Sequence, residues 1–171
     1  NTLKYSVNRK LLDKGAANFI KKQDAESRSP LALKLLNVDG IGGVMIGKDF
    51  ITITKLEEGD WDHVHKSASE TIEKHLTDGE AVLTGELQES LSSQNYSEIE
   101  KKIQAVLDEH IRPAVARDGG DVALERFEDG IAYLSMQGAC SGCPSSAMTL
   151  KMGIEVKLKE AVPEVVEVVA V

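Results

Sequence analysis

The feature that most constrains the fold is a break in the hydrophobic pattern between residues 77 and 96. This stretch, TDGEAVLTGELQESLSSQNY, is rich in Gly, Ser, Thr, Gln and acidic residues and keeps no helical or strand period along its length. Such a composition is typical of a flexible linker. A chain of 171 residues is long enough for two small domains. We therefore predict a first domain over residues 1–76, a linker over 77–96 and a second domain over 97–171.

In the first domain the pattern predicts strands and helices in alternation. Thr2–Val7 alternates like an edge strand, and residues 13–28 are polar and irregular. Ser29 followed by Pro30 is typical of a helix start, because serine caps helices and proline is favoured at their first position. Two apolar runs joined at residues 47–49 predict a hairpin. A helix is expected from Trp61, with apolar residues at helical spacing: Trp61, Val64, Ala68, Ile72 and Leu76.

The second domain is expected to open with a long amphipathic helix. Ser97 and Glu100 have the spacing of a capping box. Pro113 lies late in the helix and should kink or end it. The predicted buried stripe consists of Ile99, Ile103, Val106, Leu107, Ile111 and Ala114.

The residue pattern in the rest of the second domain predicts a hairpin, a helix and a last strand. Gly119 is expected to end the first helix in a left-handed conformation, and the hairpin turns at residues 128–130. A helix over Pro144–Ala161 would turn Ala147, Leu150, Ile154 and Leu158 inward, and residues 165–171 read as a strand. The order is α-β-β-α-β, and the predicted fold class is α+β, with two small α+β domains.

Composition and charge exclude several classes of protein. The formal net charge is −8, whereas a nucleic-acid binder needs a basic face. No apolar run approaches the roughly 20 residues of a membrane-spanning helix, and the opening NTLKYSVNRK lacks the apolar core of a secretory signal. Two cysteines allow at most one intrachain disulfide. We expect an intracellular protein without nucleic-acid or membrane partners. Because the chain opens on Asn1 rather than Met, residues are expected to precede it.

The two cysteines, Cys140 and Cys143, lie in the stretch GACSGCPSS. Cys143 stands just before Pro144, so it is expected at the N-cap of the following helix. Free backbone N–H groups and the positive end of the helix dipole favour a thiolate there. Glycine and serine fill most of the loop and would let a ligand approach the backbone. The spacing alone leaves three interpretations open: a metal or cluster site, a redox thiol pair, or two cysteines with no special role.

Two thiolates do not complete a metal site, because zinc takes four ligands and iron–sulfur clusters are usually held by four cysteines. Two chains that each supply Cys140 and Cys143 would place four sulfurs around one cluster, and thiolate softness favours iron–sulfur or zinc. A thioredoxin-like site needs a strand–helix–strand setting. Because a helix and a hairpin precede the loop, that interpretation is disfavoured. The histidines do not complete a site from sequence: His63, His65, His75 and His110.

Motifs along nearly the whole chain resemble the Nfu family of NifU-like proteins. The first part, through NTLKY, SPLALKLLNVDGIGGVMIGKDFITITK and the helix from Trp61, resembles the Nfu N-terminal domain. The second part resembles the C-terminal NifU-like domain through RP (Arg112–Pro113), DGGDV (Asp118–Val122), GACSGCPSS, TLKMGIE (Thr149–Glu155) and PEV (Pro163–Val165). This resemblance is far more specific than the cysteine spacing alone.

The resemblance implies an iron–sulfur cluster scaffold or carrier and not an enzyme. It implies that a [4Fe–4S] cluster is held between two subunits by Cys140 and Cys143 and passed to apo-proteins; [2Fe–2S] is the alternative, because both cluster types take four ligands. The implied partners are a second copy when loaded, apo iron–sulfur proteins and cluster-assembly proteins. The family occurs in bacteria and mitochondria, so we expect the bacterial cytoplasm, or alternatively the mitochondrial matrix. Two other hypotheses remain: a thiol–disulfide oxidoreductase using the same cysteines, and a structural zinc protein.

Overall fold

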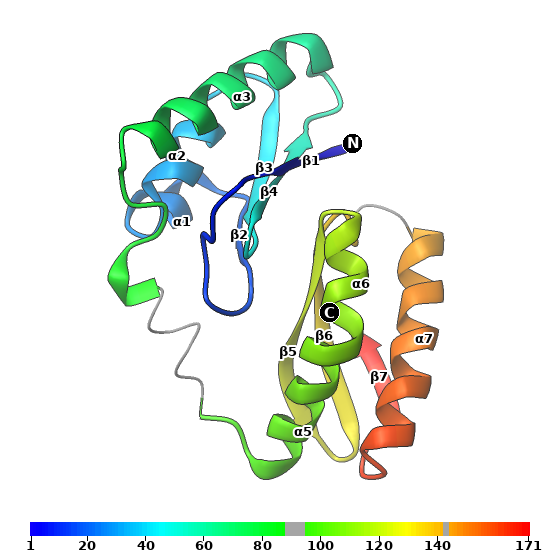
Figure 1. Ribbon diagram of the computed structural model, residues 1–171. Helices are drawn as coiled ribbons and strands as arrows, with labels where there is room; N and C mark the ends of the chain where they lie inside the picture. Colours follow the sequence, from blue (N-terminus) through cyan, green and yellow to red (C-terminus); the bar gives the residue numbers. More distant parts are fainter. Residues whose placement is uncertain (88–94, 142–143) are drawn as a thin grey trace. The chain divides into compact units, whose positions relative to one another are not determined.

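The structure, a computed structural model, describes residues 1–87, 95–141 and 144–171, with the side chains of the last range from Met148 onward. The chain divides into two compact units after residue 94. Each unit has its own hydrophobic core and combines helices with one sheet (Figure 1). The predicted α+β class is therefore confirmed. Within the described ranges, no helix has the length and apolar composition that a bilayer crossing requires.

A four-stranded antiparallel sheet forms one layer of the first unit. Its strands are β1 (Thr2–Ser6), β2 (Ala17–Phe19), β3 (Ile41–Ile46) and β4 (Phe50–Lys55), in the spatial order β1-β4-β3-β2. β1 stands at the edge of the sheet, as its alternating pattern predicts. β3 and β4 form the predicted hairpin. Of the paired strands, only β3 and β4 follow each other directly in the chain; β2 pairs with β3 across two intervening helices, and β1 pairs with β4.

Two longer helices, α2 (Pro30–Leu36) and α3 (Trp61–Thr77), pack together, α2 against β3 and α3 against β4. Ser29 caps α2 as predicted, because its Oγ accepts a hydrogen bond from Ala32 N at 3.0 Å. α3 buries Val64, Ala68 and Ile72, three members of the predicted stripe. At the end of α3 the residue that is fully buried is His75, and Leu76 packs only partly against the core.

The region 13–28, expected to be irregular, contains regular structure. It holds β2 and the one-turn helix α1 (Lys22–Glu26). Ala17 and Phe19 are buried on either side of the partly exposed Asn18. An alternation over three residues is too short to be distinguished by pattern, since strand signals need four to eight residues. The strand exists because β3 offers it a pairing partner.

Residues 78–87 pack on the first unit, which corrects the prediction that a flexible linker begins at residue 77. Leu83 and Leu87 are 6% and 5% exposed and belong to the core of this unit. Two leucines four residues apart, with glycine and acidic residues around them, do not make a recognisable period. Tertiary contact buries them nonetheless. Residues 88–94 of the predicted linker lie outside the described residues.

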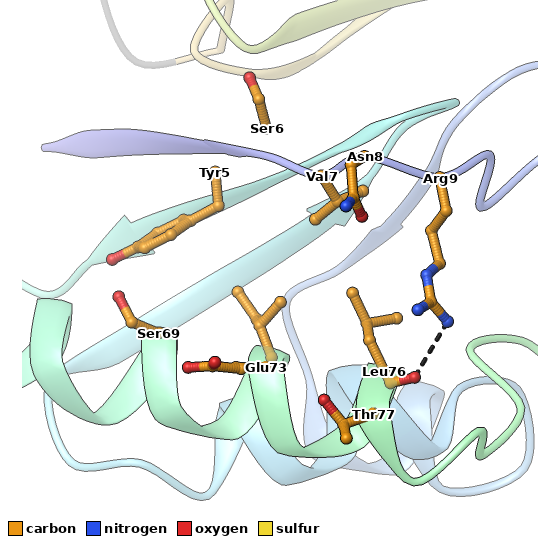
Figure 2. A pocket seen from close by; sticks show the side chains of 10 residues that line it. Tyr5, Ser6, Val7, Asn8, Arg9, Ser69, Glu73, Leu76 and Thr77 are labelled. Atoms are coloured by element: carbon orange, nitrogen blue, oxygen red, sulfur yellow. Dashed lines mark hydrogen bonds between the residues drawn. The ribbon is translucent and has the colours of Figure 1, made fainter.

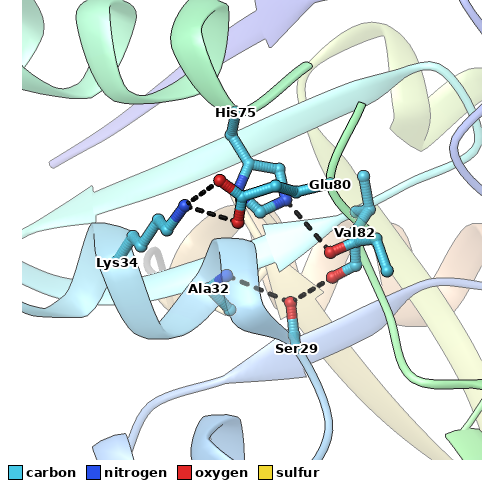
Figure 3. A network of polar contacts seen from close by, with 7 residues as sticks. Ser29, Ala32, Lys34, His75, Glu80 and Val82 are labelled. Carbon is cyan, nitrogen blue, oxygen red and sulfur yellow. Dashed lines mark hydrogen bonds and ion pairs between the residues drawn. The ribbon is translucent and has the colours of Figure 1, made fainter. Parts of the chain in front are cut away.

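A network of polar contacts fastens this segment to α2 and α3 (Figure 3). The Ser29 hydroxyl, which caps α2, also donates to the Val82 carbonyl at 2.6 Å. Lys34 Nζ lies 2.7 Å from both carboxylate oxygens of Glu80. His75, 1% exposed, has its Nδ1 3.6 Å from Glu80 Oε2. The segment after α3 is therefore part of the first unit.

The second unit opens with α5 (Glu98–Val106), and the predicted capping box is present. Ser97 Oγ accepts from Glu100 N at 3.3 Å, and Glu100 Oε2 accepts from Ser97 N at 2.8 Å. The other oxygen of Glu100 accepts a bond from Phe127 N at 3.3 Å. One carboxylate therefore both caps the helix and fixes it to the neighbouring strand.

Pro113 is accommodated by a π-helical turn and does not end the helix. The turn, η1 (Leu107–Ile111), links α5 to α6 (Arg112–Arg117). Proline has no N–H for the helical bond to the carbonyl four residues earlier, and a π turn is one way to absorb that loss. The π turn inserts an extra residue, so the helix face shifts by one position. Val115 is consequently buried where the regular period had predicted Ala114, which is exposed.

A three-stranded sheet backs these helices. β5 (Gly120–Glu128) and β6 (Ile131–Gly138) form the predicted antiparallel hairpin, and β7 (Glu167–Ala170) runs parallel to β6. The connection from β6 to β7 is α7 (Pro144–Ala161), which buries Ile154 and Leu158 as predicted. The prediction for Ala147 lies outside the described side chains.

The parallel pairing of β6 with β7 places the cysteine loop inside a β-α-β unit. The loop leaves β6 and is followed directly by α7. The setting that a thioredoxin-like site needs is therefore present, which corrects the expectation that disfavoured an oxidoreductase. The elements before the loop are a helix and a hairpin, as predicted, but the strand that completes the unit comes after it in the chain.

Candidate metal centre

Cys140 lies in a tight turn directly after β6. The strand ends at Gly138, whose φ of 60° lies in the left-handed region that glycine adopts readily. The Gly138 carbonyl accepts hydrogen bonds from Ser141 N at 3.2 Å and from Ser141 Oγ at 2.8 Å. Cys140 N donates to the Gln137 carbonyl at 3.3 Å. The backbone that carries the thiol is therefore held by local main-chain bonds.

The two glycines of the DGGD motif have different roles beside this turn. Gly119 has a φ of 79° and ends α6, as predicted. Gly120 pairs with Gly138 across the sheet. A Cβ added to Gly120 would overlap Cys140 Sγ and would lie 3.2 Å from Cys140 N. Gly120 therefore leaves the space in which the cysteine side chain sits.

The surroundings of Cys140 disfavour its thiolate. The side chain is half-buried and packs against the core of the second unit. Burial, and then the negative charges of Asp121 and Asp118, raise the pKa of the Cys140 thiol to about 11. The thiol is consequently protonated at neutral pH, and a bound cation would have to displace that proton. The thiolate-favouring helix terminus was predicted for Cys143, which lies outside the described residues.

An ion pair next to Gly120 joins two of the motifs that flank the cysteines. Arg112 Nε lies 3.3 Å from Asp121 Oδ1 and donates to the Val122 carbonyl at 3.0 Å. Arg112 Nη1 lies 2.7 Å from Asp108 Oδ1. Burial raises the pKa of Asp121 and the neighbouring guanidinium opposes this shift. The pair fixes α6 to the strand that carries Gly120.

Sequence reasoning identified the RP and DGGDV motifs but missed what joins them. Neither the Gly120–Cys140 contact nor the pair of Arg112 with Asp121 has a periodic signal. The presence of these residues in the quoted motifs was the only available sign. DGGD itself is a helix end and a strand start, as expected, and its Asp121 faces Arg112.

The described residues contain no group of three or more His, Cys, Asp or Glu side chains placed to hold a metal ion. Each histidine has other surroundings. His65 Nδ1 lies 3.0 Å from the Tyr5 hydroxyl, and the two rings stack with centroids 5.6 Å apart. His75 is buried beside Glu80, while His63 and His110 are exposed. Of the two predicted ligands, the structure therefore places Cys140 alone.

A separate hollow of about 470 Å³ lies in the first unit, between the edge strand β1 and α3 (Figure 2). The Tyr5 ring lies on its strand side, and Ser69 and Glu73 project from the helix. Arg9 lies at one end, where its Nη1 donates to the Leu76 carbonyl at 2.9 Å. Hydroxyl, carboxylate and guanidinium groups thus line a surface that contains no cysteine.

Comparison with known proteins places both units in one family. Residues 1–79 match the family described as scaffold protein Nfu/NifU N terminal, and residues 103–169 match the NifU-like domain. The two matches occur in the order that the motifs predicted. The chain belongs to the Nfu/NifU-like family.

Relatives match along almost the whole chain. A human protein named as an iron–sulfur cluster scaffold homolog, mitochondrial, is 40% identical over 167 residues, covering 96% of this chain and 65% of the relative. A NifU-like protein of Schizosaccharomyces pombe is 38% identical, covering 92% and 62%. NifU-like protein 4, mitochondrial, of Arabidopsis thaliana is 36% identical, covering 96% and 60%. The chain thus spans about three-fifths of the length of these curated relatives.

Proposed function

We propose that this protein is an iron–sulfur cluster scaffold that carries a cluster on its CxxC loop and hands it to apo-proteins. The observation that carries the proposal is the position of Cys140, half-buried in a turn shaped around it by Gly120 and Gly138. Family membership agrees, because a relative 40% identical to this chain is named as a cluster scaffold. The cluster is the cargo, and Cys140 and Cys143 are its proposed ligands.

Two chains are needed to hold one such cluster. The whole sequence contains two cysteines, and iron–sulfur clusters are usually held by four. A symmetric pair of loops supplies the required number without any other residue type. We therefore propose a [4Fe–4S] cluster bridged by two subunits, with [2Fe–2S] as the other cluster that four cysteines hold. Holding and releasing a cluster requires no general base or nucleophile, so we propose a carrier and not an enzyme.

The surroundings of Cys140 suit a ligand that must both bind a cluster and release it. The half-buried thiol is protonated at neutral pH when no cation is near, because burial and two carboxylates raise its pKa to about 11. Release of the cluster thus leaves a neutral thiol at Cys140 and not an exposed thiolate. The ion pair between Arg112 and Asp121 fixes α6 to the strand beside this turn and involves neither proposed ligand.

The proposed partners are apo iron–sulfur proteins and cluster-assembly proteins. Relatives from a human and a plant source are named as mitochondrial. These names favour the mitochondrial matrix over the bacterial cytoplasm as the compartment in which the protein works.

A thiol–disulfide oxidoreductase is the second candidate, because the loop lies in a β-α-β unit directly before a helix. Such a setting is typical of thioredoxin-like redox sites. This candidate predicts a reversible bond between Cys140 and Cys143 and turnover of disulfide substrates in the absence of iron. Each turnover would oxidise the dithiol to a disulfide and reduce the substrate disulfide to two thiols.

Anaerobic reconstitution of the reduced protein with iron and sulfide separates the two candidates. The scaffold predicts about four irons and four sulfides per two chains, with loading abolished by Cys140→Ser or Cys143→Ser. Ser141→Ala changes the same loop without removing a thiol and should load. An absence of iron uptake, together with closure of the cysteines to a disulfide that turns over, would replace the scaffold with the oxidoreductase.

A further inference from the structure

α7 carries apolar side chains on both of its faces. Ile154 and Leu158 point inward and are fully buried. On the outer surface Met148, Met152 and Val156 are 67%, 65% and 56% exposed. Residues four apart lie on one face of a helix, so these three form a continuous stripe, which we call the α7 stripe. Exposed apolar side chains that adjoin one another, unlike single ones, point to an interaction surface.

The α7 stripe is adjacent to the cysteine loop. The helix begins at Pro144, one residue after Cys143. With a rise of about 1.5 Å per residue, Met148 lies about 6 Å along the helix from its start and Val156 about 18 Å. Any second chain that brings its own cysteines to a cluster at this loop must approach the first turns of α7.

Gly153 lies beside the stripe, and no contact among the described residues requires a glycine there. A Cβ built on Gly153 meets nothing within 4 Å, and alanine is much more favourable than glycine inside a helix. A glycine on the outer surface of a helix allows the backbone of a neighbouring molecule to approach closely. It therefore points to the same surface as the exposed methionines.

Paired charges border the stripe on one side. Lys159 Nζ lies 2.6 Å from Glu155 Oε1, and Glu155 Oε2 accepts a hydrogen bond from Val168 N at 3.2 Å. These charged groups are satisfied within the chain and need no partner across an interface. An apolar centre with a polar rim is the usual arrangement of a protein–protein interface.

We propose that the α7 stripe is the surface on which a second copy of this chain packs when two CxxC loops share one cluster. The inference rests on the proposed function, since a site with two thiolates is incomplete without the second copy. The contact is isologous: each stripe meets the other across a two-fold axis that passes through the cluster. A recipient apo-protein is the competing occupant, and the experiment distinguishes it.

Because the stripe is small, formation of the dimer depends on the bound cluster. Three side chains cover a few hundred Å² at most, below the roughly 800 Å² per partner of a stable interface. The stripe alone is therefore too weak to hold two chains together. The cluster and the stripe contribute jointly, and removal of the cluster releases the subunits.

The test compares Met152→Glu with Val166→Glu. Met152 lies at the centre of the stripe, and Val166, 67% exposed, lies outside α7 in the same unit. Each purified variant is loaded with iron and sulfide without oxygen, and iron per chain and mass in solution are measured over a range of protein concentrations. For Met152→Glu we expect the loaded dimer to dissociate with a constant raised at least about tenfold, because two carboxylates would face each other in an apolar contact. Val166→Glu should behave like the wild type.

Protein concentration separates loss of the dimer from loss of a ligand. Met152→Glu should recover iron binding at high concentration by mass action, whereas Cys140→Ser should not. Gly153→Ala provides a test in which folding and assembly respond in opposite directions. It should raise the melting temperature of the apo protein, because alanine favours the helix, and should weaken the loaded dimer, because the added methyl group keeps the second helix away.

Each outcome has a defined meaning. If the wild type takes up no iron, the proposed function fails. If the wild type loads and Met152→Glu dimerises with equal affinity, the scaffold stands and the α7 stripe is not the dimer surface. If Met152→Glu dimerises normally but transfers its cluster more slowly to a purified apo [4Fe–4S] protein, the stripe binds recipients and the proposal is overturned. Normal dimerisation of Gly153→Ala would also count against a close helix–helix contact.

Discussion

Replacing Gly120 with alanine tests whether Cys140 can take its position only because residue 120, next to it across the sheet, has no side chain. An alanine Cβ would overlap Cys140 Sγ and would lie 3.2 Å from Cys140 N and 3.3 Å from Cys140 Cβ. Gly120 is not among the residues with positive φ, so alanine adds no backbone strain and its effect comes from the contact alone. Overpacking of this kind costs about 1–3 kcal/mol.

Two assays measure the two consequences of Gly120→Ala. Urea unfolding of the apo protein should show a loss of stability of about 1–3 kcal/mol. The loaded protein should lose iron to a chelator faster than the wild type, since the sulfur cannot keep its place beside an added methyl group. Gly153→Ala is the matched control for the unfolding assay, because its Cβ meets nothing within 4 Å; it should be neutral or stabilising there.

A double-mutant cycle decides whether the contact is the cause. In a Cys140→Ala background the sulfur is gone, and Gly120→Ala should cost less than in the wild type. The difference should fall within the range of about 0.5–3 kcal/mol seen for residues in contact. An equal cost in both backgrounds would show that Cys140 Sγ does not occupy the space beside Gly120, and the reasoning about this site would be refuted.

Three further predictions concern stability, and urea unfolding measures each. Ser29→Ala should destabilise the first unit by about 1–3 kcal/mol, because it removes a helix cap and leaves the part-buried carbonyl of Val82 without this donor; a cost near zero would contradict the polar network. Leu83→Ala should cost about 2–5 kcal/mol if residues 78–87 belong to the core, whereas a true linker would tolerate it. Hydrogen bonds from Ser97 lower the pKa of Glu100 below its ordinary value of 4.5, so its contribution is present above that value and lost as the pH falls through the folded-state pKa. Glu100→Gln should therefore lose less stability than the wild type between about pH 6 and pH 3, and an identical decline would refute this.

Local patterns were sufficient where the structure depends on neighbouring residues. The cap at Ser29, the capping box at Ser97 and the left-handed Gly119 all appear where they were predicted. Their partners lie within a few residues along the chain, so composition and spacing are enough to specify them. The hairpin turn at residues 128–130 follows the same rule: Asp129 and Gly130 both have positive φ, as a tight two-residue turn requires.

The incorrect expectations arise where the structure departs from any periodic signal in the sequence. Leu83 is buried by contacts with segments far from it in the sequence, and β2 forms because β3 pairs with it. Val115 replaces Ala114 in the core because a π turn before Pro113 shifts the helix face by one residue. In each case a tertiary contact or a local irregularity overrides the period, and neither leaves a repeating signal along the chain.

For the candidate site, the sequence by itself determined the chemistry: two thiols three residues apart, and motifs that identify a family of cluster scaffolds. Only the tertiary structure decided how Cys140 is held. Gly120 approaches it across the sheet, and Asp121 raises its pKa from a neighbouring strand. These residues are about twenty positions away from the cysteine in the chain. Residue types follow from the sequence directly, whereas such distances depend on β5 pairing with β6, which brings separated residues into contact.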